Sequence, residues 1–150
     1  MYKHVLIPTD GSELASKAVD EGLRFAKWAN ATVTCLLVTP HFHTTKEMEE
    51  GFRDAADKVL EKLHGSDAQT HAREVLDPVA KRSAKSGVAC ETLSVVSDRP
   101  SEAIVETAKQ RGCDVIIMAS HGRSGFKALM LGSETMNVLT SSRIPVLVLR

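Results

Sequence analysis

The sequence predicts a single α/β domain built on a five-stranded parallel sheet, with strand order 3-2-1-4-5 and helices on both faces. Short apolar runs alternate with amphipathic stretches along the 150 residues, which is the strand–helix repeat of such a fold. The run from Thr32 to Val38 is apolar almost without interruption, as is typical of a parallel strand covered on both faces. Because crossovers between parallel strands are right-handed, the helices divide between the two faces.

The first strand and the first helix have the clearest signals. Val5 to Ile7 is a brief β-rich run, and Pro8-Thr9-Asp10-Gly11-Ser12 follows it as a set of turn and helix N-cap residues. We therefore expect a helix to begin near Ser12. Small or apolar residues recur along it at helical spacing, namely Ala15, Ala18, Val19, Gly22, Ala26 and Ala29. Such a stripe suits a helix that packs closely on a sheet.

Two helical pieces are expected between the second and third strands. Apolar spacing predicts a helix from about Thr45 to His64, with His64-Gly65-Ser66-Asp67 as its end. The second piece is interrupted at Asp77-Pro78, where proline either kinks a helix or occupies its first turn. Gly87 ends this piece.

The last third of the chain supplies the remaining elements. Ala89 to Val96 has the mixed polarity of a strand at a sheet edge. Asp98-Arg99-Pro100-Ser101 starts a helix that ends near Gly112. The other expected elements are a strand from Val115 to Met118, a helix from about Ser133 to Ser141 and a strand from Pro145 to Leu149.

Charge and composition exclude several classes of partner. Nineteen basic side chains balance nineteen acidic ones, so no net field favours nucleic acid or an anionic membrane. No apolar stretch approaches the roughly 18 residues of a membrane span, and no signal-peptide pattern precedes the first strand, so we expect a cytoplasmic protein. Cys35, Cys90 and Cys113 are odd in number and widely spaced, which favours reduced thiols over disulfides or a zinc site.

A glycine-containing loop, MASHGRSGFKALMLGSET from Met118 to Thr135, joins the fourth strand to the last helix. Gly122, Gly125 and Gly132 let backbone N–H groups converge without β-carbons in the way. Gly132-Ser133 lies at the expected helix start, where unpaired donors and the positive end of the helix dipole attract phosphate. On spacing alone the same glycines equally suit a helix cap and a surface turn. The P-loop and dinucleotide-binding patterns are absent.

Ligands of open parallel sheets lie beyond the carboxyl ends of the strands, where the winding reverses. The order 3-2-1-4-5 would place Pro8-Thr9-Asp10 beside the glycine loop. The strand order and the ligand position therefore form one joint hypothesis.

These residues resemble the universal stress protein family, whose ATP-binding members carry G-x2-G-x9-G-[ST] after the fourth strand. Here Ala119-Ser120-His121-Gly122, nine residues and then Gly132-Ser133 keep that spacing, with Ala119 in place of the first glycine. The resemblance also covers VLIPTDGSELASKAV from Val5, LLVTP from Leu36 and SSRIPVLVLR from Ser141, and the stretch from about His41 to Ser86 diverges. It implies one universal stress protein domain over residues 1–150, with the adenine nucleotide α-hydrolase-like fold.

The resemblance implies an adenine nucleotide, ATP, over the ends of the first and fourth strands, with Mg²⁺ or Mn²⁺ accompanying the phosphates. Pro8, Thr9 and Asp10 match the loop that contacts base and ribose, and Val38 matches the adenine contact of the second strand. Met118 and Ala119 would border base and ribose. The stretch that wraps the phosphates is matched by Gly122, Arg123, Gly132, Ser133, Glu134 and Thr135.

The chemistry of two of these side chains indicates how each would act on the phosphates or the metal. The Arg123 guanidinium suits phosphate oxygens. Glu134 would contribute its backbone N–H, while its carboxylate points away or reaches the divalent metal.

The sequence offers no convincing catalytic residue and no protein-held metal site. Asp10 could act as a metal ligand or base, or could cap the first helix. His121 could touch phosphate or lie in an exposed loop. The spacing of the other histidines matches no standard zinc pattern, namely His41, His43, His64 and His71. We therefore expect a stress-response binding or regulatory module in which ATP hydrolysis is absent or slow.

Two alternatives differ in function. One is a dimeric interaction protein of the same fold that binds no nucleotide, for which Ala119 is the best support. The other is an ATP-hydrolysing or pyrophosphatase-type enzyme, a class that usually carries an S-G-G-x-D-S-type loop where this chain has Pro8-Thr9-Asp10-Gly11-Ser12.

A homodimer is expected through the last strand. Val146 to Leu149 would form an apolar edge strand that invites pairing with a second copy. Members of the family that the chain resembles commonly dimerise through this strand. The alternative is an edge blunted by Arg143 and Arg150.

Overall fold

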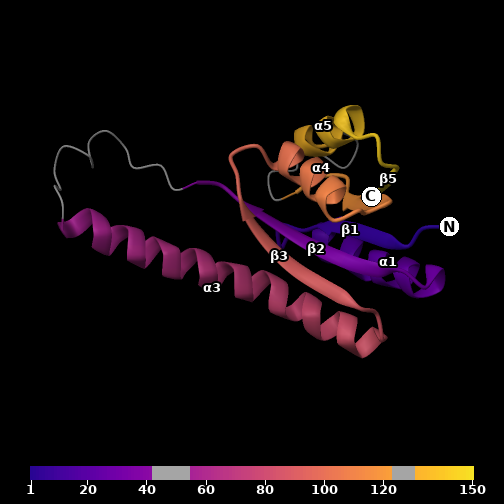
Figure 1. Ribbon diagram of the computed structural model, residues 1–150, viewed down its shortest axis with the longest axis horizontal. Coiled ribbons are helices and arrows are strands. Elements are labelled where there is room, and N and C mark those ends of the chain that lie inside the picture. The colour runs from indigo at the N-terminus through magenta and orange to yellow at the C-terminus, as the bar shows by residue number, and fades with distance from the viewer. Residues whose placement is uncertain (42–54, 123–130) are drawn as a thin grey trace.

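The structure, a computed structural model, describes residues 1–41, 55–122 and 131–150, with side chains left out for 55–64. One parallel sheet has the strand order β3-β2-β1-β4-β5, as predicted (Figure 1). Its strands are β1 (His4–Pro8), β2 (Thr32–Thr39), β3 (Cys90–Val96), β4 (Val115–Ala119) and β5 (Val146–Leu149). The winding reverses between β1 and β4, because β1 pairs with both β2 and β4.

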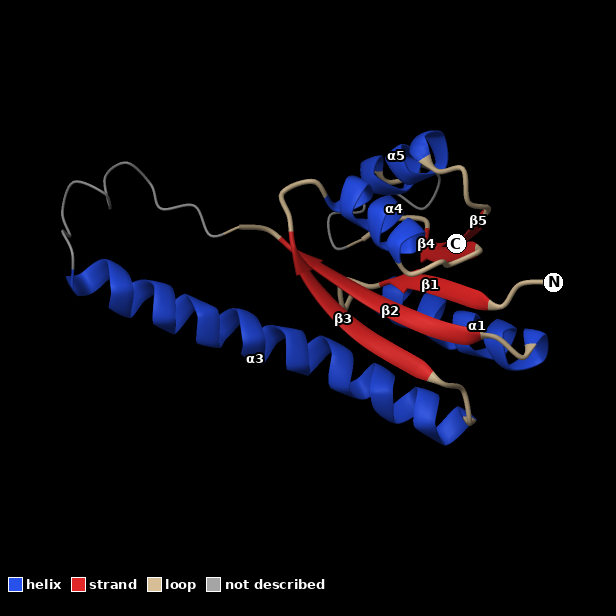
Figure 2. Cartoon of the chain, viewed as in Figure 1, coloured by secondary structure: helices blue, strands red, loops and turns tan. Residues whose placement is uncertain are grey.

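Helices cover both faces of the sheet, which confirms the predicted layers (Figure 2). They are α1 (Glu13–Ala29), α3 (Ala55–Ser86), α4 (Pro100–Gln110) and α5 (Ser133–Ser141). Side chains alternate along β1, so Val5 and Ile7 join the core under α1 and α3 while Leu6 joins the core under α4 and α5. The central strands are buried on both sides.

Helix α1 begins and packs as its sequence predicts. Ser12 is the N-cap, and its hydroxyl accepts a hydrogen bond from the Ala15 N–H at 3.2 Å. The small-residue stripe is buried, and a β-carbon on Gly22 would overlap Cδ1 of Ile7. The absence of a side chain at Gly22 therefore lets α1 pack closely on the sheet.

Helix α3 corrects the expectation of two helical pieces. It is continuous from Ala55 to Ser86, with Gly65 and Pro78 inside it, and the expected start near Thr45 lies outside the described residues. A proline inside a helix costs about 3 kcal/mol in isolation. Leu76 and Val79 are buried against the sheet on either side of Pro78, and this packing holds the helix through the proline, whereas Gly65 lies in an exposed stretch.

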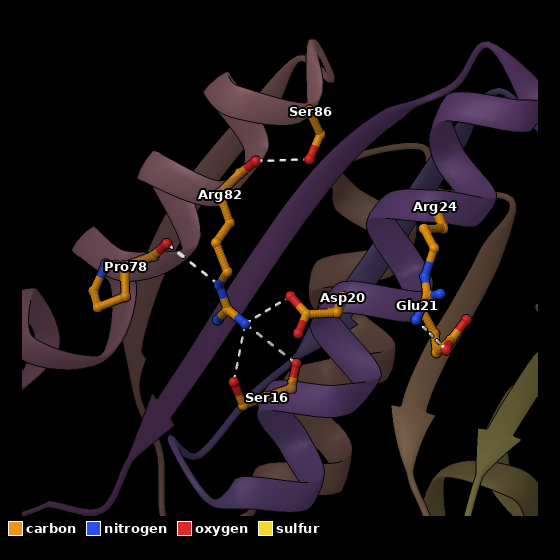
Figure 3. Close-up of polar contacts among 7 residues, drawn as sticks. All are labelled: Ser16, Asp20, Glu21, Arg24, Pro78, Arg82 and Ser86. Carbon is orange, nitrogen blue, oxygen red and sulfur yellow. Dashed lines mark hydrogen bonds and ion pairs between the residues drawn. The ribbon is translucent and has the colours of Figure 1, made fainter.

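An arginine joins α3 to α1 (Figure 3). Nη1 of Arg82 donates to the Ser16 hydroxyl at 2.9 Å and forms an ion pair with the Asp20 carboxylate at 2.8 Å. Its Nε donates to the carbonyl of Pro78 at 3.4 Å, one turn earlier. Arg82 thus supports α3 beside its proline and fixes it to α1.

The three cysteines are free thiols, as expected. Cys35 and Cys113 are buried and Cys90 is half-buried. Burial raises the pKa of the Cys35 thiol to about 12, so this thiol stays protonated at neutral pH. No helix in the described part of the chain is both long and apolar enough to cross a membrane.

Candidate functional site

A cavity of about 530 Å³ opens at the carboxyl edge of the sheet, between the loop after β1 and the start of α5. The predicted site residues that the structure describes all line it, namely Pro8, Thr9, Asp10, Val38, Met118, Ala119, Gly122, Gly132, Ser133, Glu134 and Thr135. Arg123 lies outside the described residues. The cavity is thus formed by segments more than 100 residues apart in the sequence.

Part of the cavity wall is apolar. Leu36 and Val38 contribute from β2, Met118 from β4, and Pro100 and Ile104 from α4. Leu36, Pro100 and Ile104 were not predicted as site residues. The helix-start pattern around Pro100 could have indicated the lining residues of α4. Every helix that follows a parallel strand starts at the carboxyl edge of the sheet, which is where the cavity opens.

The loop after β1 is fixed by its own polar groups. The Thr9 N–H donates to the Leu36 carbonyl at 2.8 Å, which continues the pairing of β1 with β2. Oδ1 of Asp10 accepts the Ser12 N–H at 2.9 Å and closes a short turn. The interpretation of Asp10 as the cap of α1 is therefore wrong, since Ser12 fills that position.

Gly122 brings the loop after β4 against the loop after β1. A β-carbon on residue 122 would overlap Oδ2 of Asp10 and would lie 3.4 Å from its Cγ. This contact places the two loops side by side, as the strand order predicted.

Ser120 joins β5 to the start of α5. Its N–H donates to the Leu149 carbonyl at 2.7 Å, and its carbonyl accepts the Gly132 N–H at 2.7 Å. The expectation that the Gly132 amide is free for a ligand is therefore wrong. Glycine at 132 instead permits a close approach, because a β-carbon there would lie 3.2 Å from Cα of His121.

The first turn of α5 offers backbone donors to the cavity. Gly132 is the N-cap and has no side chain to cap the helix. Among the described residues, the N–H groups of Ser133, Glu134 and Thr135 meet no acceptor. The Thr135 hydroxyl is buried and donates to the Ala119 carbonyl at 3.1 Å, so only its amide remains available.

The Glu134 carboxylate turns from its own helix toward α4. Oε2 accepts the Ser101 N–H at 2.8 Å, in the first turn of α4. Arg99, the N-cap of α4, makes no side-chain capping bond. Glu134 therefore caps α4 from a different helix, and its carboxylate points away from its own amide.

Charged groups at the cavity are few. Among the described lining residues, Asp10 and Glu134 are acidic and none is Lys or Arg. Nδ1 of His121 lies 3.1 Å from the Ser120 hydroxyl. Within the described residues, no group of three or more His, Cys, Asp or Glu side chains could hold a metal ion.

The model of the universal stress protein family matches the chain over residues 1–150. The chain belongs to the universal stress protein family. It is 28% identical over 150 residues to universal stress protein YxiE of Bacillus subtilis, with 100% of both chains covered. It is 33% identical over 162 residues to universal stress protein MJ0577 of Methanocaldococcus jannaschii, with 100% of this chain and 96% of the relative covered.

Solved structures of the family share the fold. The structure of MJ0577 superposes with a TM-score of 0.81 at 32% identity and covers 99% of this chain and 96% of that one. A universal stress protein in complex with cAMP has a TM-score of 0.70 at 24% identity, covering 99% of this chain and 97% of that one. The Archaeoglobus fulgidus protein in complex with dAMP has a TM-score of 0.68 at 17% identity, covering 100% of this chain and 98% of that one.

Proposed function

We propose that this universal stress protein binds ATP, an adenine nucleotide, at the carboxyl ends of β1 and β4 and acts as a stress-response regulatory module. One observation carries the proposal: a single cavity is lined both by apolar side chains and by a turn of backbone amides that meet no acceptor within the described parts of the chain. A nucleotide has the same two parts, a flat apolar base and an anionic phosphate chain.

The base would lie against the apolar part of the wall, at Val38 and Met118. Burial of its ring faces there removes apolar surface from water. Pro8, Thr9 and Asp10 would contact base and ribose from the loop after β1.

The phosphates would lie at the first turn of α5. The amides of Ser133, Glu134 and Thr135 supply donors, and the positive end of the helix dipole favours the anion. Gly122 and Gly132 would allow a close approach, and Arg123 would add a guanidinium. Mg²⁺ or Mn²⁺ would arrive on the phosphate oxygens, since the described residues form no metal cluster of their own.

Two observations favour nucleotide binding over the interaction protein without a ligand. The cavity keeps about 530 Å³ with the Ala119 methyl group in its wall, a volume within the range of small-molecule sites. Two proteins that share this fold form complexes with cAMP and with dAMP.

A homodimer through β5 completes the proposal. Among the described strands, β5 pairs with β4 and forms one edge of the sheet. Leu147 is 43% exposed on this strand. An uncovered edge with apolar side chains suits pairing with a second copy.

Equilibrium dialysis with ATP and Mg²⁺ tests nucleotide binding. We expect saturable uptake of one ATP per chain, and we expect Val38→Glu to abolish it by placing a charge in the apolar part of the wall. Val96→Glu is the matched control, because Val96 is 53% exposed and does not line the cavity. Absence of saturable uptake by the unmodified protein would favour the interaction protein.

Incubation with radiolabelled ATP tests the regulatory role. Fast multiple turnover of ATP by the protein would contradict that role.

A further inference from the structure

We propose that Glu134 makes this cavity discriminate among nucleotides by charge. Without a divalent cation, its carboxylate weakens the binding of a triphosphate more than the binding of a monophosphate. This inference rests on the proposed function and identifies the residue that decides which charge state the same site accepts.

Glu134 is an exposed residue of the cavity wall whose carboxylate is held by a hydrogen bond. Glu134 stands in the first turn of α5, and Oε2 is held by the Ser101 N–H at 2.8 Å. Because the Arg99 side chain does not cap α4, this bond satisfies a donor that the helix would otherwise leave open. Pro100, next to Ser101, lines the same cavity. The charge therefore stays between two helix N-termini that both face the proposed ligand.

The charge lies beside the turn that would hold the phosphates, with the carboxylate directed from that turn toward α4. The amides of Ser133, Glu134 and Thr135 form one helical turn, and Glu134 adds a full negative charge to that turn. The other carboxylate of the described lining, that of Asp10, belongs to the loop after β1, where the Ser12 N–H holds it and where it lies against Gly122. Of these two acidic side chains, Glu134 is the one that belongs to α5 itself.

Repulsion between like charges grows with the charge of the ligand. A triphosphate carries more negative charge than a monophosphate, so a fixed carboxylate near the phosphate chain penalises it more. A divalent cation on the phosphates offsets this repulsion, because the ion becomes the largest local charge. Glu134 would thus link triphosphate binding to the presence of the cation.

Glutamine at position 134 separates charge from geometry. The amide oxygen of Glu134→Gln can accept the Ser101 N–H as the carboxylate does, so the cap of α4 is kept while the charge is removed. Glu134→Ala removes both charge and cap. Glu102→Gln is the matched control, since Glu102 lies in the first turn of α4, pairs with Arg99 and does not line the cavity.

Isothermal titration calorimetry with AMP and with ATP, each in EDTA and in excess Mg²⁺, tests the proposal. In EDTA we expect Glu134→Gln to bind ATP about tenfold more tightly than the unmodified protein and AMP within about twofold. Excess Mg²⁺ should shrink the gain for ATP to about twofold. Glu102→Gln should behave as the unmodified protein does.

The outcomes separate this inference from the proposed function. An unchanged affinity of Glu134→Gln for ATP in EDTA would overturn the role of the charge, and so would an equal gain for AMP and ATP. A change seen in Glu134→Ala but not in Glu134→Gln would assign the effect to the cap and would also overturn it. If no variant bound AMP or ATP with Mg²⁺ present, the proposed function itself would fail.

Discussion

Gly122 lies directly against the Asp10 carboxylate, although 112 positions separate the two residues in the sequence. The carboxylate cannot move aside freely, because its Oδ1 also holds the Ser12 N–H at 2.9 Å. The absence of a side chain at position 122 is therefore a condition for the two loops to meet.

We expect Gly122→Ala to weaken ATP binding at least tenfold and to reduce the free energy of unfolding by about 1 kcal/mol, because the new methyl group displaces Asp10. Calorimetric titration and urea unfolding measure the two effects. The stability cost of Gly122→Ala should shrink in an Asp10→Ala background, since the overlap is then relieved. Equal costs in both backgrounds would contradict the steric explanation.

Ser133→Pro tests the backbone donors of α5. Proline suits this first helical position, and the extended conformation of Gly132, with φ −62° and ψ 153°, is the one that a residue before proline prefers. The substitution removes the Ser133 N–H and hydroxyl together, so we expect ATP affinity to fall about tenfold at nearly unchanged stability.

Ser133→Ala is its control, because it removes the hydroxyl and keeps the N–H. Retained affinity in Ser133→Ala would assign the loss in the proline variant to the amide. If both variants bound ATP as the unmodified protein does, phosphate binding at the α5 turn would be refuted. Titration with ATP and Mg²⁺ gives both affinities.

Elements whose signals are local could be predicted from the sequence, and those set by packing could not. The turn residues from Pro8 to Ser12 fix the end of β1 and the cap of α1 within a few residues. Gly65 and Pro78 are equally strong local signals, yet α3 runs through both. Burial of Val79 against the sheet outweighs the neighbouring proline. Gly65 lies in an exposed stretch, where glycine costs a helix only about 1 kcal/mol.

The same distinction holds at the site. The glycine spacing and the strand order predicted which loops meet, and those loops line one cavity. The hydrogen bond from the Gly132 N–H to the Ser120 carbonyl could not be predicted, because it depends on the path of the chain across twelve residues. Ile104 was missed because its place in the cavity wall depends on how α4 packs over the sheet.

Val148→Pro tests the homodimer. The carbonyls of Pro145 and Leu149 accept hydrogen bonds from the N–H groups of Ile116 in β4 and of Ser120 just after it. Donors alternate along a strand, so the Val148 N–H faces the open edge. Proline there removes an outward donor and leaves the pairing with β4 intact. We expect light scattering to show a dimer for the unmodified protein and a 16.3 kDa monomer for the variant. Val148→Ala, which keeps the N–H, should remain dimeric, and a monomeric unmodified protein would contradict the proposal.

Two glycine-to-alanine substitutions in helices should have opposite effects on stability. Gly22→Ala forces a methyl group onto Cδ1 of the buried Ile7, and we expect it to lower the free energy of unfolding by about 1 kcal/mol. Gly65→Ala meets no atom within 4 Å in α3 and should raise it by up to about 1 kcal/mol through helix propensity. Urea unfolding of both variants checks the signs. If Gly22→Ala raised the free energy of unfolding, the steric explanation would be wrong, because Ile7 would then have moved away from the added methyl group.

The residues that line the cavity are spread along the sequence from Pro8 to Thr135, and this has a thermodynamic consequence. No short fragment of the chain contains the complete wall, so a molecule that occupies it binds the native chain and not the denatured one. By mass action such a molecule raises the melting temperature, by an amount that corresponds to about 2.7 kcal/mol at one hundred times its dissociation constant. A melting curve recorded against a panel of metabolites would therefore rank candidate effectors by affinity without any assay of activity.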